Sequence, residues 1–172
     1  MRYSGKQIVH PGVRARDLPA LMELYELNYI QLRRLLPDLD ALPDHCRSRV
    51  PGALDLYLSV RERCRYTTIL QLSYRFVEGE GFTEAPDVVV CMYHDAQVAE
   101  VISRGGRRRG RQGDYDRYRH RYSIEHKWQV NRFLHKWLGY CLHQGHGFSP
   151  ARSRLADAIR AIEDDRALSV ES

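Results

Sequence analysis

Two segments of the chain carry apolar residues at helical spacing. In residues 21–36, leucines and tyrosines recur every three or four positions, with Asp17 before them as a typical helix start signal and Pro37 after them as a stop signal. In residues 124–142, a broad apolar face with two tryptophans follows Ser123, the expected N-cap. Both segments are predicted to be amphipathic helices, and the second is the expected main packing partner of a sheet.

Between these helices the pattern changes to the two-residue alternation that is typical of strands. Four strands are expected, at residues 54–60, 66–76, 88–93 and 97–103. The short link at 62–65 predicts an antiparallel hairpin, and Pro86-Asp87 is the expected start of the third strand. Three prolines in residues 37–51 predict a loop there.

The fold class follows from this order of elements. We predict an α+β domain in which a four- or five-stranded, mainly antiparallel sheet is packed by the N-terminal helix and the long C-terminal helix. With 172 residues and 43% hydrophobic content, the chain has room for one such domain, at residues 17–147. We expect a flexible arm at 1–16 and a charged tail, either helical or disordered, at 148–172.

Composition also bears on the cellular compartment. No apolar run approaches the roughly 18 residues of a transmembrane helix, and the first residues lack the apolar core of a signal peptide. The four cysteines are widely spaced and form no C-x-x-C pair, which fits a reducing environment better than a disulfide framework. We therefore expect a cytoplasmic protein with no membrane partner.

The net charge of +5 is concentrated in one segment, which we call the basic loop, residues 104–121. It holds eight arginines against two acidic residues, so the rest of the chain is close to neutral. Arginines that neutralise phosphates, beside tyrosines that stack on bases, suit RNA or single-stranded nucleic acid. The nucleic-acid candidates are Arg107, Arg108, Arg109, Arg111, Tyr115 and Tyr118. The alternative is a solvated loop without a ligand.

Three motifs of the chain resemble those of a known family. They are Tyr66-Thr67-Thr68, then Tyr93-His94-Asp95-Ala96 with Val98-Ala99-Glu100-Val101, and Glu125-His126-Lys127 leading to Asn131-Arg132-Phe133-Leu134. Together they resemble the YqiB-like family of small bacterial cytoplasmic proteins, a domain of unknown function, over roughly residues 18–147. The resemblance implies no activity, cofactor or catalytic residue. Residues 107–111 and the tail after Pro150 lie outside its pattern.

Polar side chains at the end of the third predicted strand are the candidate site. A bend at His94 and Asp95 brings both side chains to one rim of the sheet, close to the next strand. On the second helix, Lys127 and Asn131 are four residues apart and share a face, so a cleft between that face and the sheet would suit an anion. The ligand-binding candidates are Tyr93, His94, Asp95, Glu100, Lys127 and Asn131.

Each of these candidates has a plainer explanation. In this alternative, Asp95 and His94 form an ordinary surface turn, and the helix face that carries Lys127 is exposed to solvent without a ligand. A carboxylate at position 100, between apolar neighbours, faces solvent or is paired. Its candidate partners are Arg63, Arg65 and Lys127. A catalytic role for Glu100 requires a second titratable group nearby.

The sequence offers little support for metal or nucleophile chemistry. Cys141, His143 and His146 are zinc-type ligands, but no second paired cluster accompanies them and Cys141 falls on the apolar stripe of the helix. No motif of a serine or cysteine nucleophile and no phosphate-binding glycine loop is present. We therefore expect neither a metal nor a cofactor.

These observations favour a non-catalytic module that binds an anionic partner, either a nucleotide-like ligand or RNA. The first alternative is an enzyme that acts on a nucleotide or phosphoester, with His94, Asp95 and Glu100 as acid, base or metal groups. The second alternative is a protein–protein interaction module that docks through the basic loop or the tail. Convergence of the three titratable residues in one pocket favours the enzyme, and their separation counts against it.

Overall fold

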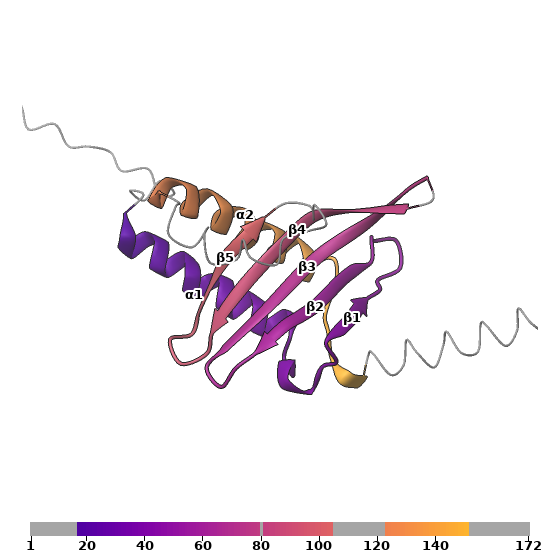
Figure 1. The fold of residues 1–172 in the computed structure, drawn as a ribbon, viewed down its shortest axis with the longest axis horizontal. Coiled ribbons are helices and arrows are strands. Elements are labelled where there is room, and N and C mark those ends of the chain that lie inside the picture. The colour runs from indigo at the N-terminus through magenta and orange to yellow at the C-terminus, as the bar shows by residue number, and fades with distance from the viewer. Residues whose placement is uncertain (1–16, 80, 105–122, 152–172) are drawn as a thin grey trace, which may run out of the picture.

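The computed structural model describes residues 17–79, 81–104 and 123–151. The chain runs through the following elements in order: α1 (Leu18–Leu35), the 3-10 turn η1 (Leu39–Ala41), β1 (His45–Ser48), β2 (Leu56–Arg63), β3 (Thr67–Glu78), β4 (Gly81–Tyr93), β5 (Val98–Arg104) and α2 (Ile124–His143). Figure 1 shows the strands as one twisted sheet, with both helices on the same side of it. Among the described residues, no helix combines the length and hydrophobicity needed to cross a bilayer.

The five strands of the described residues form a single sheet in the order β1-β2-β3-β4-β5, and every neighbouring pair is antiparallel. This order follows from the short links between consecutive strands, because a short link only allows the chain to turn back beside the strand it has left. The prediction of an α+β fold with a mainly antiparallel sheet and two helices is thus confirmed, with five strands.

Two details of the predicted strands are wrong. The segment at 37–51, predicted as a loop, contains η1 and the four-residue edge strand β1. Its prolines flank β1 and do not interrupt it, so every residue of β1 is able to pair with β2. The strand β4 begins at Gly81, well before the predicted start at Pro86. Proline lacks the N–H group that a regular strand needs, but Pro86 lies beside a register shift in the pairing with β3. A missing N–H group is tolerated at such a position, so the strand continues through the proline.

The helix boundaries agree with the predicted caps. The side chain of Asp17 accepts a hydrogen bond of 2.9 Å from the backbone of Ala20 at the start of α1. Ser123 accepts one of 3.3 Å from His126 at the start of α2. Both bonds satisfy N–H groups that have no partner inside a helix.

The hydrophobic core lies between the two helices and one face of the sheet. Alternate residues of the central strands, such as Leu70 and Leu72, are fully buried there. Leu134 and Leu138 of α2 pack against them, and Trp137 is 7% exposed. The second predicted helix thus packs on the sheet, but it is not the main partner as predicted, because it shares the core with Leu32 and Leu35 of α1, which are fully buried. Beyond its end, Phe148 joins the core, and its N–H group donates to the carbonyl of Leu35 at 2.8 Å.

Candidate functional site

The carboxylate of Glu100 holds three polar groups together at the edge strand β5. Its oxygens accept hydrogen bonds from the hydroxyls of Tyr93 at 3.0 Å and Tyr25 at 3.2 Å. The Lys127 ammonium lies 3.5 Å away, and the Glu100 side chain is 15% exposed. Of the partners considered for this carboxylate, Lys127 is the one that forms the ion pair. We call these four residues the Glu100 cluster.

The two tyrosines of this cluster act as donors. Burial, followed by the charge of Glu100, raises the pKa of Tyr25 above its usual value. The pKa of Tyr93 is raised by burial first and by its Cys91 and Glu100 neighbours after that. Both hydroxyls therefore stay protonated at neutral pH, and the hydrogen bonds that they donate satisfy a carboxylate that would be costly to leave without partners.

Asn131 has a structural position between β5 and both helices. Its side chain is fully buried, and its Oδ1 atom accepts a hydrogen bond of 2.9 Å from the backbone of Val101. Its Nδ2 atom donates to the carbonyl of Lys127 at 2.8 Å, and Asn28 of α1 donates to Asn131. Of the predicted row, Asn131 is therefore bonded to the sheet and to α1, whereas Lys127, whose side chain is 32% exposed, pairs with Glu100.

His94 points to a different neighbourhood from the Glu100 cluster. Its Nδ1 atom lies 3.2 Å from the hydroxyl of Tyr29 on α1, and its Nε2 atom lies 2.9 Å from the hydroxyl of Thr68 on β3. Its backbone N–H donates to Tyr66 at 2.8 Å, which ties the β4–β5 turn to the β2–β3 link. Asp95 follows it in the turn and is exposed. The three titratable residues that the enzyme hypothesis requires are thus not assembled in one pocket.

The β4–β5 turn and the β2–β3 link lie at the same end of the sheet, next to α1 (Figure 1). Between these segments and η1 lies a cavity of about 1050 Å³. Among the described residues, four arginines line it: Arg33 and Arg34 from the last turn of α1, Arg63 from the end of β2, and Arg65 from the β2–β3 link. The sides are completed by Glu26, Tyr29, Ile30, Asp40, Thr68 and His94, among others. We call this space the arginine cavity.

The arginines of the cavity differ in how they are held. Arg63 donates a hydrogen bond of 2.9 Å to the Asp44 carboxylate and one of 2.6 Å to the carbonyl of Leu42, so it fixes the segment after η1. Arg33 makes a longer contact of 3.4 Å with the carbonyl of Pro37. Arg34 and Arg65 are exposed, and the Arg65 guanidinium lies 5.1 Å from the centre of the Tyr66 ring. The last two are the best placed to meet a ligand.

Four arginines and two acidic residues, Glu26 and Asp40, belong to the described lining of the cavity, and a further carboxylate, that of Asp44, pairs with Arg63. The remaining excess of positive charge favours an anion. Planar guanidinium groups bind phosphates and carboxylates through two parallel hydrogen bonds. The geometry thus suits a small anionic molecule.

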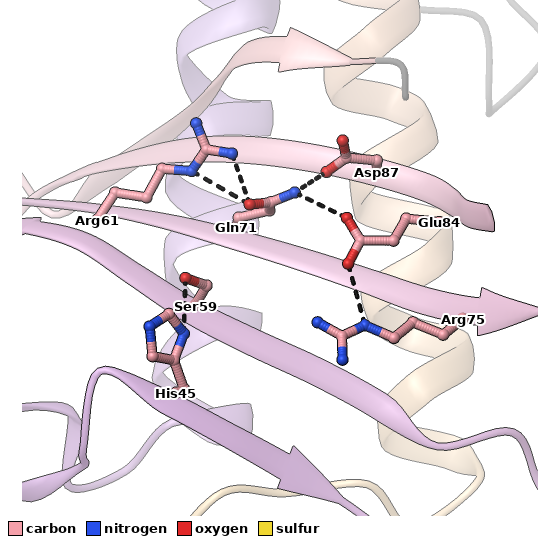
Figure 2. A network of polar contacts seen from close by, with 7 residues as sticks. All are labelled: His45, Ser59, Arg61, Gln71, Arg75, Glu84 and Asp87. Atoms are coloured by element: carbon pink, nitrogen blue, oxygen red, sulfur yellow. Dashed lines mark hydrogen bonds and ion pairs between the residues drawn. The ribbon is translucent and has the colours of Figure 1, made fainter. Parts of the chain in front are cut away.

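A second polar network covers the opposite face of the sheet (Figure 2). Gln71, which is 7% exposed, accepts two hydrogen bonds from Arg61 and donates to Glu84 and to the buried Asp87. Glu84 in turn accepts a hydrogen bond of 3.0 Å from Arg75. These groups bind one another across β2, β3 and β4, so the network holds strands together.

The candidate metal ligands of the sequence serve the core. Cys141 is buried, its Sγ atom lies 3.3 Å from the Tyr74 hydroxyl, and burial raises the pKa of its thiol. The Nδ1 atom of His146 lies 3.1 Å from Ser48, and burial lowers its pKa. Within the described residues, no three histidine, cysteine or acidic side chains come together as a metal site.

Most of the arginine cavity was not predicted from the sequence. Arg63 and Arg65 were expected only as candidate partners of Glu100, and no role was predicted for Arg33, Arg34 or Tyr29. One signal was present: paired arginines at the end of a helix and a second pair in a tight link. The nucleic-acid candidates Arg107, Arg108, Arg109, Arg111, Tyr115 and Tyr118 lie outside the described residues, as do the arm at 1–16 and most of the tail.

Comparisons with known proteins agree with the resemblance of the motifs. A family model described as "Protein of unknown function (DUF1249)" matches residues 31–147. The "Uncharacterized protein YqiB" of Escherichia coli strain K12 is 37% identical over 137 residues, which cover 75% of this chain and 91% of that protein. The proteins of the same name from strains CFT073 and O157:H7 match to the same extent. No solved structure gives a significant match.

Proposed function

The chain belongs to the DUF1249 family of proteins of unknown function, and we propose that it is a non-catalytic module that binds a small anionic ligand in the arginine cavity. We place this activity in the cytoplasm. All four cysteines lie among the described residues, and no disulfide joins any two of them there, which suits a reducing compartment.

The observation that carries the proposal is the meeting of two arginine pairs from distant parts of the chain. Arg33 and Arg34 belong to α1, and Arg63 and Arg65 follow almost thirty residues later, yet they line one cavity. Small-molecule sites are concave and typically enclose roughly 300–1,000 Å³. The volume of this cavity, about 1050 Å³, lies just above that range.

Fixed and free groups have separate roles in this proposal. Arg63 positions the wall of the cavity through Asp44 and Leu42. Arg34 and Arg65 bind the anion, because exposed guanidinium groups have donors available to it. His94 and Thr68, bonded to each other at 2.9 Å, form part of the lining and keep the β4–β5 turn in place.

Binding without catalysis is the simpler activity for this arrangement. General acid–base catalysis requires a titratable group within reach of the reacting atoms. Both ring nitrogens of His94 are engaged by hydroxyls, and Glu100 is bonded to two tyrosines and Lys127. A phosphatase-type activity on a phosphoester that depends on His94 would overturn the non-catalytic part of the proposal.

Titration of the purified protein with inorganic pyrophosphate by isothermal calorimetry tests the proposal. We expect binding that weakens by roughly tenfold or more in the double variant Arg34→Ala/Arg65→Ala, since two charge-assisted contacts are lost. The matched control is Arg132→Ala, which removes an exposed arginine from α2. If Arg132→Ala weakens pyrophosphate binding as much as the double variant does, or if the unchanged chain does not bind pyrophosphate, the proposal is contradicted.

The same titration separates the cavity from the basic loop. A variant with alanine at Arg107, Arg108, Arg109 and Arg111 should bind pyrophosphate as the unchanged chain does. Loss of binding in that variant alone would move the anion site to the loop and favour the nucleic-acid hypothesis, for which steep salt dependence is the expected companion.

A further inference from the structure

The arginine cavity has two ends of different chemistry, and both are set by the position of residues along α1. Glu26 and Arg34 both line it, and eight residues of helix between them span about 12 Å at 1.5 Å per residue. The lining along α1 is therefore long enough to contact two separate parts of one ligand.

The basic end lies at the C-terminus of α1. Arg33 and Arg34 stand in its last turn, and the Arg63 side chain is fixed to Asp44 just beyond η1. A phosphate group at this end neutralises positive charge and offers acceptors to several guanidinium groups at once.

The other end lies beside the middle of α1, where the Tyr29 hydroxyl meets the ring of His94 at 3.2 Å. This contact brings the β4–β5 turn, including Ala96 and Gln97 of the lining, next to the helix. Ile30 contributes a side chain that is 53% exposed, and the carboxylate of Glu26 is the only acidic group at this end within the described lining. A second phosphate is unfavourable here, because Glu26 repels it.

We infer that the ligand is a nucleoside phosphate whose phosphates lie at the basic end, beside Arg34, and whose base lies along Tyr29 and Ile30. The inference rests on the proposed anion site and deepens it. An aromatic base buries apolar surface against Ile30 and Tyr29, and Glu26 accepts a hydrogen bond from an amino group of the base. An inorganic polyphosphate or a dicarboxylate has neither the aromatic surface to pack against Ile30 and Tyr29 nor the amino group to donate to Glu26.

Calorimetric titration with inorganic pyrophosphate, adenosine diphosphate and guanosine diphosphate tests this assignment on the full chain. We expect at least one of the two nucleotides to bind tenfold or more tightly than pyrophosphate. In the double variant Glu26→Ala/Ile30→Ser, both changes being on exposed side chains, that advantage should disappear while pyrophosphate affinity stays equal or rises.

The outcomes separate the two proposals. If pyrophosphate and both nucleotides bind with equal affinity, the base-binding end is wrong and the anion site stands. If the nucleotide advantage persists unchanged in the double variant, the base lies elsewhere and the inference is overturned. If nothing binds, both proposals fail. Circular dichroism of the variant confirms that the comparison is made on folded protein.

Discussion

The Oδ1 atom of Asn131 lies 2.9 Å from the backbone nitrogen of Val101, so a side chain of α2 takes the place of a further strand at the edge of the sheet. An exposed edge strand invites pairing with other chains. The Asn131 side chain occupies one of these backbone positions on β5, and its Oδ1 atom also accepts a hydrogen bond of 3.4 Å from Asn28 of α1. One buried amide thus holds three elements in register.

Replacing Asn131 by alanine should lower the free energy of unfolding by roughly 1–3 kcal/mol, because it leaves the Val101 N–H group without its acceptor. Urea unfolding followed by circular dichroism measures the change. The neighbouring exposed Arg132→Ala variant should stay within about 0.5 kcal/mol of the unchanged chain. Similar stability of the two variants would mean that the Asn131 contacts contribute little.

The fold was largely predictable because its elements are determined locally. Asp17 and Ser123 are cap residues followed by amphipathic helices, and alternation marks the longer strands. The strand β1 was missed because four residues between prolines carry too short a pattern to distinguish strand from loop. Its place is decided by pairing with β2, which is a tertiary contact.

The site was predictable only in part. The strand end at His94 was identified, but its partners Tyr29 and Thr68 come from α1 and β3, and no local pattern joins them. Arginines in the last turn of a helix are also common for a plain reason, since they interact favourably with the helix dipole. Only the meeting of α1 with the β2–β3 link distinguishes Arg33 and Arg34 from that ordinary case.

The Glu100 cluster predicts a loss of stability at high pH. The folded state raises the pKa of Tyr93 above the usual 10.0, so the folded protein holds this proton more tightly than the unfolded chain. The resulting stabilisation is complete below pH 10 and is lost as the pH rises above 10 toward the folded pKa. Unfolding free energies measured from pH 9 to 11.5 should fall less steeply in Tyr93→Phe. If the unfolding free energies of the unchanged chain and of Tyr93→Phe fall in parallel as the pH rises, Tyr93 ionises alike in the folded and unfolded states, and the prediction is wrong.

Arg63 should prove structural, unlike its neighbour Arg65. Its side chain is 29% exposed and bridges Asp44 and Leu42, so Arg63→Ala should cost about 1 kcal/mol. Arg63→Lys should not restore the loss, because one ammonium cannot reproduce both contacts of the planar guanidinium. Thermal unfolding compares the melting temperatures of these variants with that of Arg65→Ala, for which we expect a melting temperature close to that of the unchanged chain. A larger loss in Arg65→Ala than in Arg63→Ala would reverse the assigned roles.

The network around Gln71 predicts a charge-sensitive variant. Gln71→Glu removes the donor to Asp87 and places a third carboxylate beside it and Glu84, so we expect a loss of roughly 2 kcal/mol or more at pH 7. Part of the loss should be recovered at pH 5, where carboxylates in such a group begin to take up protons. Melting temperatures at both pH values measure the effect. Ser59→Ala, which removes only the exposed contact with His45, is the control, and an equal shift in both variants would contradict the prediction.

The most direct measurement of the central claim is a ¹H–¹⁵N NMR titration of the labelled protein with inorganic pyrophosphate. If the anion binds in the arginine cavity, the largest shift changes fall on the backbone amides of residues 33–34, 63–66 and 94–97, which border it. The same amides should move much less in Arg34→Ala/Arg65→Ala at an equal, subsaturating ligand concentration. Shift changes confined to other parts of the chain, or none at saturating pyrophosphate, would contradict the account.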